Sequence, residues 1–206
     1  CADGQQVREE HSLYWQQRVT HFRSLPDSPD EIIFLGDSIT DGGNWSEMFE
    51  SLRVKNRGIS GDTAVGLLDR LDEVLSSKPA KIFLMIGIND LGKGRTESFL
   101  LANIKRILKE IKRTSPATAI YLQSLLPVSD RFSVFPTYVN KTPQILAVNK
   151  VLRRMSEEYE LHYIDLYSAF ADEQSKLSEK FTNDGLHLTG AGYLLWKSVI
   201  DEHVGR

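Results

Sequence analysis

The chain has 206 residues, of which 41% are hydrophobic and 26% charged, a balance typical of a globular protein and not of a disordered or fibrous one. Its 25 Lys and Arg residues and 28 Asp and Glu residues give a net charge of −3 without a basic stripe, so no nucleic-acid partner is expected. The longest apolar run, 82–88, is far shorter than the roughly 18 to 20 residues of a membrane-spanning helix, so no transmembrane segment is expected.

The first predicted element is an amphipathic helix over 5–22, because apolar side chains recur there every three or four residues and Pro26 follows. The run 31–35, rich in β-branched and aromatic residues, then predicts a buried strand that ends at Gly36. Four similar runs predict further strands, at 52–56, 81–86, 119–123 and 161–166. Helical periodicity occupies the segments between and after them, at 64–75, 99–111, 142–155 and 191–203.

Strands that alternate with helices predict an α/β fold, with a five-stranded, mainly parallel sheet covered by helices on both faces. No stretch rich in Pro, Gly or Ser separates two parts of the chain. We therefore expect a single domain over 1–206, with a helical extension at 1–26 and a core at 27–206. Ligands of such sheets bind at the carboxyl ends of the strands, which directs attention to the residues that follow each strand.

Ser38 follows the first predicted strand, so its hydroxyl is expected at this edge of the sheet. A serine hydroxyl becomes a nucleophile only beside a base, and that base needs an acceptor to orient it. Asp184 and His187, three residues apart beyond the last predicted strand, offer such a pair. Gly58 and Asn89, each just past a strand end, are suited to donate hydrogen bonds to the oxyanion of an attacked ester.

Four segments that contain these residues together resemble the sequence blocks of the GDSL, or SGNH, hydrolases. They are Gly-Asp-Ser at 36–38, Asn-Arg-Gly-Ile-Ser-Gly-Asp-Thr at 56–63, Gly-Ile-Asn-Asp at 87–90 and Asp-Gly-Leu-His at 184–187. The blocks occur in the family's order, and the resemblance runs from about residue 31 to residue 192.

This resemblance implies the SGNH hydrolase fold, a flavodoxin-like three-layer α/β/α sandwich. It implies that Ser38 is the nucleophile, that His187 is the general base and later the acid, and that Asp184 orients His187. It also implies an oxyanion hole formed by the N–H groups of Ser38 and Gly58 and the side-chain amide of Asn89. No cofactor is expected.

The substrate is less well defined, because the family includes sugar acetylesterases, lysophospholipases, thioesterases and arylesterases. The second and third blocks look like those of bacterial acylhydrolases, carbohydrate and sialate acetylesterases and platelet-activating-factor acetylhydrolase-like proteins. This favours a serine esterase that removes acetyl or other short acyl groups from a small-molecule or glycan ester. Two alternatives stay open: a lysophospholipase or thioesterase for longer acyl chains, and a glycan-binding module without activity. The intact catalytic residues weigh against the binding module.

The longest predicted loop, 124–141, lies at the same edge of the sheet, and loops of this length are often functional. It carries Arg131, Phe132, Phe135 and Tyr138, and aromatic side chains can stack on a sugar ring. We expect these four residues to contact the substrate. The alternative is that the loop only packs over the sheet.

Two further patterns match other catalytic motifs incompletely. The glycine and lysine spacing at 87–93 is that of a phosphate-binding loop, but Gly94 stands where Ser or Thr would bind magnesium. The segment 36–40 fails the Gly-x-Ser-x-Gly pattern of α/β-hydrolases because residue 40 is Thr. The histidines show no pair at the spacing of a helical metal site, so no metal is expected. We interpret three nearby carboxylates as acceptors that fix loops: Asp37, Asp62 and Asp90.

Cys1 is the only cysteine, which excludes an internal disulfide and a cysteine-based metal site. A leading Cys followed by Ala2, Asp3 and Gly4 resembles the start of a mature bacterial lipoprotein, whose first cysteine carries lipid. This favours a lipid anchor at Cys1 and a place in the bacterial cell envelope or periplasm. The alternative is a sequence that happens to begin at a cysteine, with a cytoplasmic location. The signal peptide that would decide lies outside the sequence.

Overall fold

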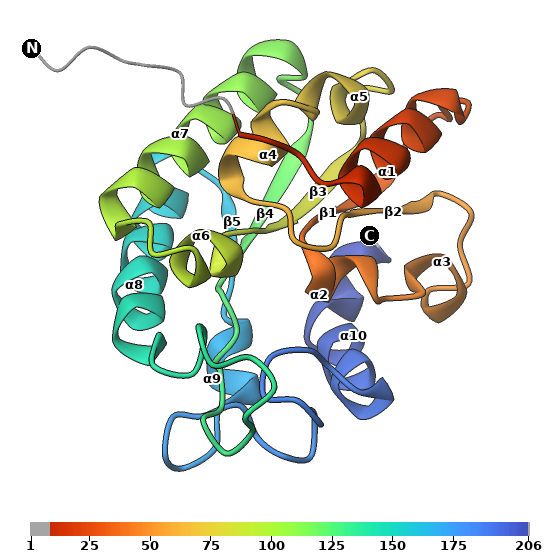
Figure 1. Cartoon of the computed structure of the whole chain (residues 1–206). Helices are drawn as coiled ribbons and strands as arrows, with labels where there is room; N and C mark the ends of the chain where they lie inside the picture. The colour runs from red at the N-terminus through yellow and green to blue at the C-terminus, as the bar shows by residue number, and fades with distance from the viewer. Residues whose placement is uncertain (1–8, 206) are drawn as a thin grey trace, which may run out of the picture.

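The computed structural model describes residues 9–205. Its strands are β1 (Ile32–Gly36), β2 (Val54–Gly58), β3 (Lys81–Met85), β4 (Ala119–Gln123) and β5 (His162–Ile164). Every neighbouring pair is parallel, and the spatial order is β2-β1-β3-β4-β5 (Figure 1). This is the strand order of flavodoxin-like folds, so the predicted parallel α/β architecture is confirmed.

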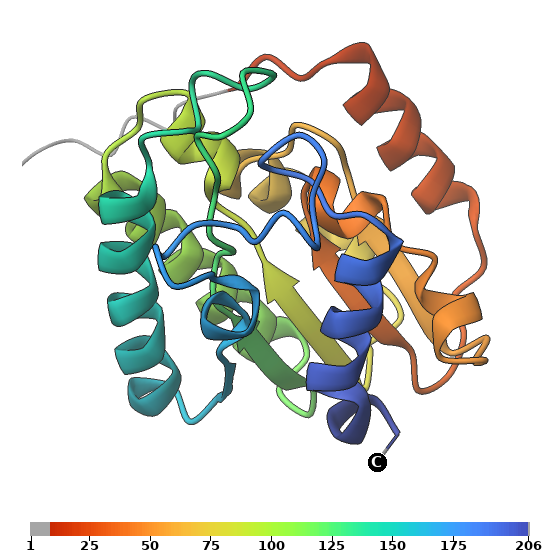
Figure 2. The ribbon, with the colours of Figure 1, turned by 90° about the horizontal axis from the view of Figure 1, so that it is seen from below.

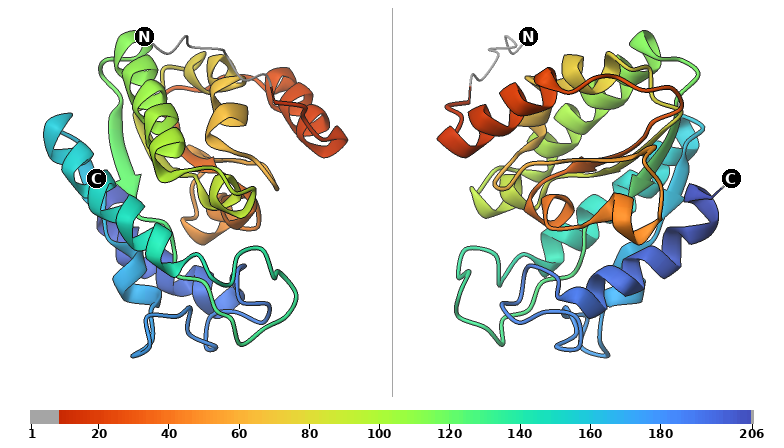
Figure 3. Two further views of the ribbon diagram at one scale, coloured as in Figure 1. Left: turned by 60° about the vertical axis from the view of Figure 1, so that its left-hand side comes forward. Right: turned by 90° about the vertical axis from the view of Figure 1, so that its right-hand side faces the viewer.

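The helices among the described residues are α1 (Leu13–Ser24), α2 (Ser38–Asp41), α3 (Trp45–Met48), α4 (Ala64–Leu68), α5 (Leu71–Leu75), α6 (Ile88–Gly92), α7 (Glu97–Thr114), α8 (Thr142–Glu158), α9 (Leu166–Phe170) and α10 (Gly190–Val204). Helices α4, α5 and α7 lie together on one side of the sheet, with α8 against α7 near β5. Helices α9 and α10 lie on the other side (Figures 2 and 3). The sheet is therefore the middle of three layers. Within the described residues, no helix is both long and apolar enough to cross a bilayer.

A row of aromatic rings crosses the sheet under α3 and α10. The strand register places one ring on each of four strands at the same level: Phe34, Phe83, Tyr121 and His162. Neighbouring rings in this row stack with centroids 4.5 to 4.9 Å apart. Trp45 of α3 stacks on Phe34 at 4.1 Å, and Trp196 of α10 meets Trp45 edge-on at 4.8 Å. These contacts fasten the C-terminal helix to the strand that leads to Ser38.

The prediction of one continuous helix over 64–75 is wrong, because two short helices, α4 and α5, occupy this segment. The break falls at Arg70, which is completely buried. Its guanidinium donates to Asp62 Oδ2 at 2.8 Å and to the carbonyl oxygens of Gly36 and Arg57 at 3.2 and 2.9 Å. A buried charge needs such partners, and hydrophobic periodicity carries no sign of them.

Strand β2 begins and ends two residues later than predicted. Leu52, placed in the predicted strand, is 88% exposed, whereas Arg57 lies inside the observed strand and is buried. Arg57 is stabilised there by Glu73, whose Oε1 lies 2.7 Å from Nε, and by the ring of Phe22. The prediction misses this shift because an arginine is rarely buried unless its charge is paired, and the sequence does not show that Glu73 is the partner.

The first helix begins at Leu13 and not at residue 5, because Ser12 caps it by accepting the Trp15 N–H at 3.1 Å. Cys1 and residues 5–8 lie outside the described residues. Periodicity predicts none of the short helices α2, α3, α6 and α9, since four or five residues are too few to show it. Helices α7, α8 and α10 agree with prediction to within three residues at each end. The division into 1–26 and 27–206 stays a prediction.

Candidate active site

Ser38 is the first residue of α2, directly beyond β1, as predicted. The turn between them is tight: a β-carbon on Gly36 would lie 2.3 Å from Thr40 Oγ1 and 2.4 Å from the Met85 carbonyl oxygen. Asp37 caps α2 by accepting the N–H of Ile39 at 3.1 Å. Ser38 is only partly buried, so its hydroxyl is accessible at the carboxyl edge of the sheet.

Three side chains that are distant in sequence form a continuous hydrogen-bonded chain at this edge. His187 Nε2 lies 3.0 Å from Ser38 Oγ, and His187 Nδ1 lies 2.8 Å from Asp184 Oδ2. With the ring proton on Nδ1, the imidazole donates to Asp184 and can accept the proton of Ser38. The structure therefore brings together the three residues that the sequence singles out.

The carboxylate of Asp184 is held by the turn that it begins. Its Oδ1 accepts the backbone N–H groups of Leu186 and His187 at 2.8 and 2.7 Å. Gly185 supplies the turn with a φ of +86°, a value that suits glycine. Burial acts to raise the pKa of Asp184, but the hydrogen bonds from Leu186 and His187 outweigh it and leave the pKa below its ordinary value. Asp184 thus stays ionised beside the imidazole.

Asp37, next to Ser38, is an acid in an apolar setting. It is buried, and its Oδ2 has no hydrogen-bond partner within residues 9–205. The carboxyl lines a small enclosed cavity with apolar side chains, among them Met85 and Leu125. Burial, with a smaller contribution from the charges of Asp62 and Asp90, raises the pKa of Asp37 from 3.8 to about 7. Asp37 holds α2 in place, as expected of a loop-fixing acceptor. Because its pKa is raised, the free-energy cost of burying its ionised carboxylate depends on pH.

This cost gives a testable prediction for Asp37→Asn. A carboxyl whose pKa is higher in the folded than in the unfolded state stabilises the fold below the unfolded pKa, and this contribution is lost as pH rises through 7. The free energy of unfolding of the wild type should therefore fall by roughly 2 to 3 kcal/mol relative to the variant between about pH 5 and 8.

Urea unfolding of both proteins at the two pH values measures this difference. Asp30→Asn, at an exposed position, is the control. Equal pH dependence in wild type and Asp37→Asn would show that Asp37 is not the group that titrates.

The backbone donors near Ser38 differ from those expected. The N–H of Gly58 donates to Asn56 Oδ1 at 2.8 Å, so it is occupied. A β-carbon on Gly58 would lie 2.2 Å from the backbone nitrogen of Asp41, which shows that this glycine permits close packing of α2 on β2. The assignment of Gly58 as an oxyanion donor is therefore wrong.

Gly61, three residues later, is a candidate oxyanion donor that was not predicted from the sequence. Among the described residues its N–H has no hydrogen-bond partner, its φ is +80°, and apart from its two chain neighbours no residue has a heavy atom within 4 Å of its β-carbon position. The sequence signal that could have identified Gly61 is its place before Asp62 in a short loop beyond a strand. The N–H of Ser38, at the first position of α2, is likewise free of a partner within the described chain.

Asn89 lies on α6, beyond β3, and is buried. Its Nδ2 donates one N–H to the carbonyl oxygen of Asp62 at 2.9 Å. Its Oδ1 accepts the hydroxyl of Tyr138 at 2.9 Å. An amide has two N–H donors, so one remains for a ligand. The same helix occupies most of the segment whose glycine and lysine spacing matches a phosphate-binding loop incompletely, and Lys93 forms an ion pair with Glu9.

The loop beyond β4 packs on the proposed catalytic residues. Phe135 meets the His187 ring edge-on, with centroids 5.1 Å apart, and Phe132 lies against Gly185. Arg131 does something different from what was expected: its guanidinium binds Asp172 at 2.7 Å, Gln174 at 2.9 Å and Glu179 at 3.5 Å. These contacts hold Arg131 against the segment that carries Asp172, Gln174 and Glu179, so Arg131 anchors the loop and its assignment to substrate contact is not supported.

The flanking carboxylates Asp62 and Asp90 act as the sequence predicts, by fixing loops. Asp62 accepts from Arg70 at 2.8 Å and from Trp15 Nε1 at 3.1 Å. Asp90 accepts the N–H of Ala64 at 3.0 Å and Arg95 at 2.9 Å. Across residues 9–205, no group of three or more His, Cys, Asp and Glu side chains could hold a metal.

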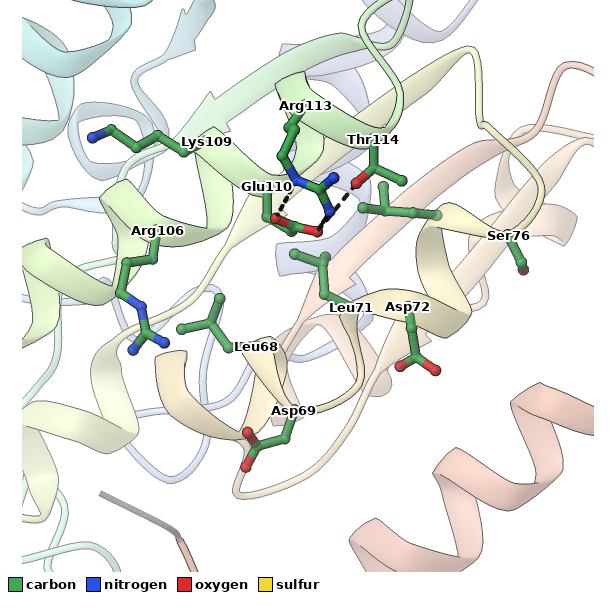
Figure 4. A pocket seen from close by; sticks show the side chains of 11 residues that line it. Leu68, Asp69, Leu71, Asp72, Ser76, Arg106, Lys109, Glu110, Arg113 and Thr114 are labelled. Carbon is green, nitrogen blue, oxygen red and sulfur yellow. Dashed lines mark hydrogen bonds and ion pairs between the residues drawn. The ribbon is translucent and has the colours of Figure 1, made fainter. Parts of the chain in front are cut away.

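A separate groove of about 750 Å³ lies between α4, α5 and α7 (Figure 4). Its floor is formed by leucines, and its rim carries three acidic and three basic side chains: Asp69, Asp72, Glu110, Arg106, Lys109 and Arg113. Glu110 is already paired with Arg113 and Thr114. The groove contains none of the residues of the Ser38 site.

Comparison with known proteins places this geometry in context. Residues 34–195 match the model of a family described as the GDSL-like Lipase/Acylhydrolase family. The alpha1 subunit of platelet-activating factor acetylhydrolase IB from Pongo abelii is 27% identical over 183 residues, which cover 84% of this chain and 76% of that protein.

Two solved structures share the fold. A protein from Streptococcus pneumonia that is named for platelet activating factor is 30% identical, with a TM-score of 0.84 over 93% of this chain and 92% of that one. A catalytic mutant of an acetylxylan esterase from Geobacillus stearothermophilus is 21% identical, with a TM-score of 0.69 over 87% of this chain and 96% of the other. The second likeness shows the fold alone.

Proposed function

Because this chain belongs to the GDSL-like lipase/acylhydrolase family and is therefore a hydrolase that acts on esters, we propose that it is a serine esterase for short acyl groups, acetyl in particular. The proposed substrate is an acetylated carbohydrate. The observation that carries the proposal is the chain of hydrogen bonds from Ser38 through His187 to Asp184.

In the proposed mechanism, Ser38 Oγ attacks the ester carbonyl while His187 Nε2 takes the serine proton. Asp184 holds the imidazole with Nδ1 protonated and stabilises the imidazolium that forms. His187 then gives the proton to the leaving alcohol, and an acyl group remains on Ser38. A water molecule, activated by His187 in the same way, releases the acid and restores the serine.

The negative oxygen of the tetrahedral intermediate needs donors that are already in place. We assign this role to the N–H of Ser38, the second N–H of Asn89 Nδ2 and the N–H of Gly61. The loop of Gly61 is tied to Asn89, because the carbonyl of the next residue, Asp62, accepts the amide. These three donors come from the ends of β1, β3 and β2, which are neighbours in the sheet.

Asn89→Ala is expected to lower kcat by roughly a hundredfold to a thousandfold, because it removes one preorganised donor to the oxyanion. The value of KM should change little, since the lost hydrogen bond forms fully only in the transition state. Steady-state kinetics with 4-nitrophenyl acetate measures both constants.

Asn44→Ala, at an exposed asparagine that caps α3 without a side-chain bond, is the matched control. A kcat for Asn89→Ala within threefold of the control would remove Asn89 from the oxyanion site.

Two findings support an acetylated sugar as the substrate. The relative from Pongo abelii is a subunit of a platelet-activating factor acetylhydrolase, and the solved structure of an acetylxylan esterase shares the fold. In this chain, the Phe135 ring meets the rings of His187 and Tyr138 edge-on, with centroids 5.1 and 6.1 Å apart. Aromatic rings beside the nucleophile's base can stack on the face of a sugar. We therefore keep Phe135 and Phe132 as proposed substrate contacts.

The substrate class is tested with 4-nitrophenyl esters from acetate to a long acyl chain, and then with acetylated xylo-oligosaccharides and acetylated sialic acids. Cleavage that depends on Ser38 and is greatest for acetate supports the proposal. A maximum at long chains identifies a lysophospholipase or thioesterase instead. Sugar binding without cleavage of any ester identifies a glycan-binding module.

A further inference from the structure

Tyr138 connects the loop beyond β4 to the Asn89 amide. Its hydroxyl donates to Asn89 Oδ1 at 2.9 Å, and its ring lies against the end of α6, the helix that carries Asn89. A β-carbon on Gly92 would lie 2.5 Å from Cε1 of the tyrosine ring, so the fit requires a glycine there. The position of the tyrosine ring is therefore set by α6, the helix that carries the Asn89 amide.

The two hydrogen bonds of Asn89 select one orientation of the amide. A 180° rotation would turn Oδ1 toward the Asp62 carbonyl and Nδ2 toward the Tyr138 hydroxyl, which would place two acceptors face to face. Burial, assisted by the negative charge of Asp37, raises the pKa of Tyr138, so the hydroxyl keeps its proton and stays a donor.

A donor on the amide oxygen also strengthens the amide as a donor. A hydrogen bond to Oδ1 draws electron density from the amide, so the N–H groups at the other end become more positive. Tyr138, Asn89 and the oxyanion would thus form one polarised chain. The effect is largest in the transition state, when the negative charge on the substrate oxygen is greatest.

We propose that Tyr138 is a positioning residue for the reaction, whose hydroxyl orients and polarises the Asn89 amide toward the oxyanion. This role differs from the substrate contact expected of Tyr138 from its place in the loop. The loop then has two functions, because Arg131 anchors one part of it and Tyr138 links another part to the oxyanion site. The inference rests on the proposed function, because it requires Asn89 to serve an oxyanion.

The test is Tyr138→Phe, which removes the hydroxyl and keeps the ring. We expect kcat for 4-nitrophenyl acetate to fall about threefold to tenfold, as for loss of one neutral hydrogen bond, with KM unchanged. In an Asn89→Ala background the same change should alter kcat less than twofold, because the residue through which Tyr138 acts is gone.

Two further variants test the position of the ring and the loss of a tyrosine hydroxyl elsewhere. Gly92→Ala should displace the tyrosine ring and lower kcat to a similar extent, although it alters neither hydrogen-bonding residue. Tyr167→Phe is the matched control, because its hydroxyl donates to the Ser175 carbonyl at 2.8 Å, away from Asn89. It loses one hydrogen bond of the same kind and should keep the wild-type kcat.

The outcomes distinguish the inference from the proposed function. A wild-type enzyme without Ser38-dependent hydrolysis refutes the proposed function itself. An active wild type with an unchanged kcat in Tyr138→Phe overturns the inference alone. A loss that persists in the Asn89→Ala background, or that appears in KM and varies with the sugar, identifies Tyr138 as a substrate contact and also overturns it.

Discussion

Ser38→Ala is expected to lower kcat for 4-nitrophenyl acetate by at least roughly ten-thousandfold, because it removes the hydroxyl that is proposed to form the acyl-enzyme. The fold should be unaffected. Among residues 9–205, the Ser38 hydroxyl has one side-chain hydrogen-bond partner, His187, and α2 is capped by Asp37 and not by the serine. The residual rate, from the oxyanion donors alone, is measured at high enzyme concentration.

Ser46→Ala is the control for this loss. Ser46 lies in the next short helix, α3, and is exposed. Its variant should have wild-type kinetics, and both variants should unfold at the wild-type temperature. Folded Ser38→Ala protein that still hydrolyses the ester at the wild-type rate would refute the catalytic scheme.

His187→Ala is expected to lower kcat nearly as much as Ser38→Ala, because a serine without a base is a weak nucleophile. The two losses should not add: a Ser38→Ala, His187→Ala double variant should be no slower than Ser38→Ala alone, since the two side chains act as one unit. His21→Ala, an exposed histidine of α1, is the control and should keep full activity.

The same residue predicts the pH dependence of the wild type. Asp184 stays ionised under mildly acidic conditions, because its hydrogen bonds from Leu186 and His187 outweigh the effect of burial on its pKa. A general base must be unprotonated to accept the serine proton, so kcat/KM is expected to fall on acidification. A kcat/KM that does not fall on acidification would argue against His187 as the base.

The site also shows how a parallel sheet gathers groups from distant parts of the sequence. Ser38, the Gly61 loop and Asn89 follow three strands that are adjacent in the order β2-β1-β3. Asp184 and His187 arrive from the far end of the chain, in the turn that precedes α10. That helix is held by Trp196, which contacts Trp45 above β1. The packing of α10 and the position of His187, the proposed base, are thus linked.

The proposed catalytic residues and the sheet were predictable from sequence because each depends on a local pattern. Short apolar runs mark buried parallel strands, since such strands are covered on both faces. Ser38, Asn89, Asp184 and His187 each lie in a short motif, and the topology of a parallel sheet places strand ends together without any further information. The Asp184–His187 contact is itself local, made across a single turn.

Tertiary packing decided the features that depend on partners far away in the sequence. Gly58 and Gly61 look alike in one motif, but α2 lies against Gly58 and leaves Gly61 open. From its place in the sequence, Arg131 is expected to be an exposed loop residue. In the fold it forms ion pairs with Asp172 and Glu179, which lie much later in the chain. A backbone N–H or a charged side chain acts according to which partner it meets, and only the three-dimensional arrangement of the chain determines that partner.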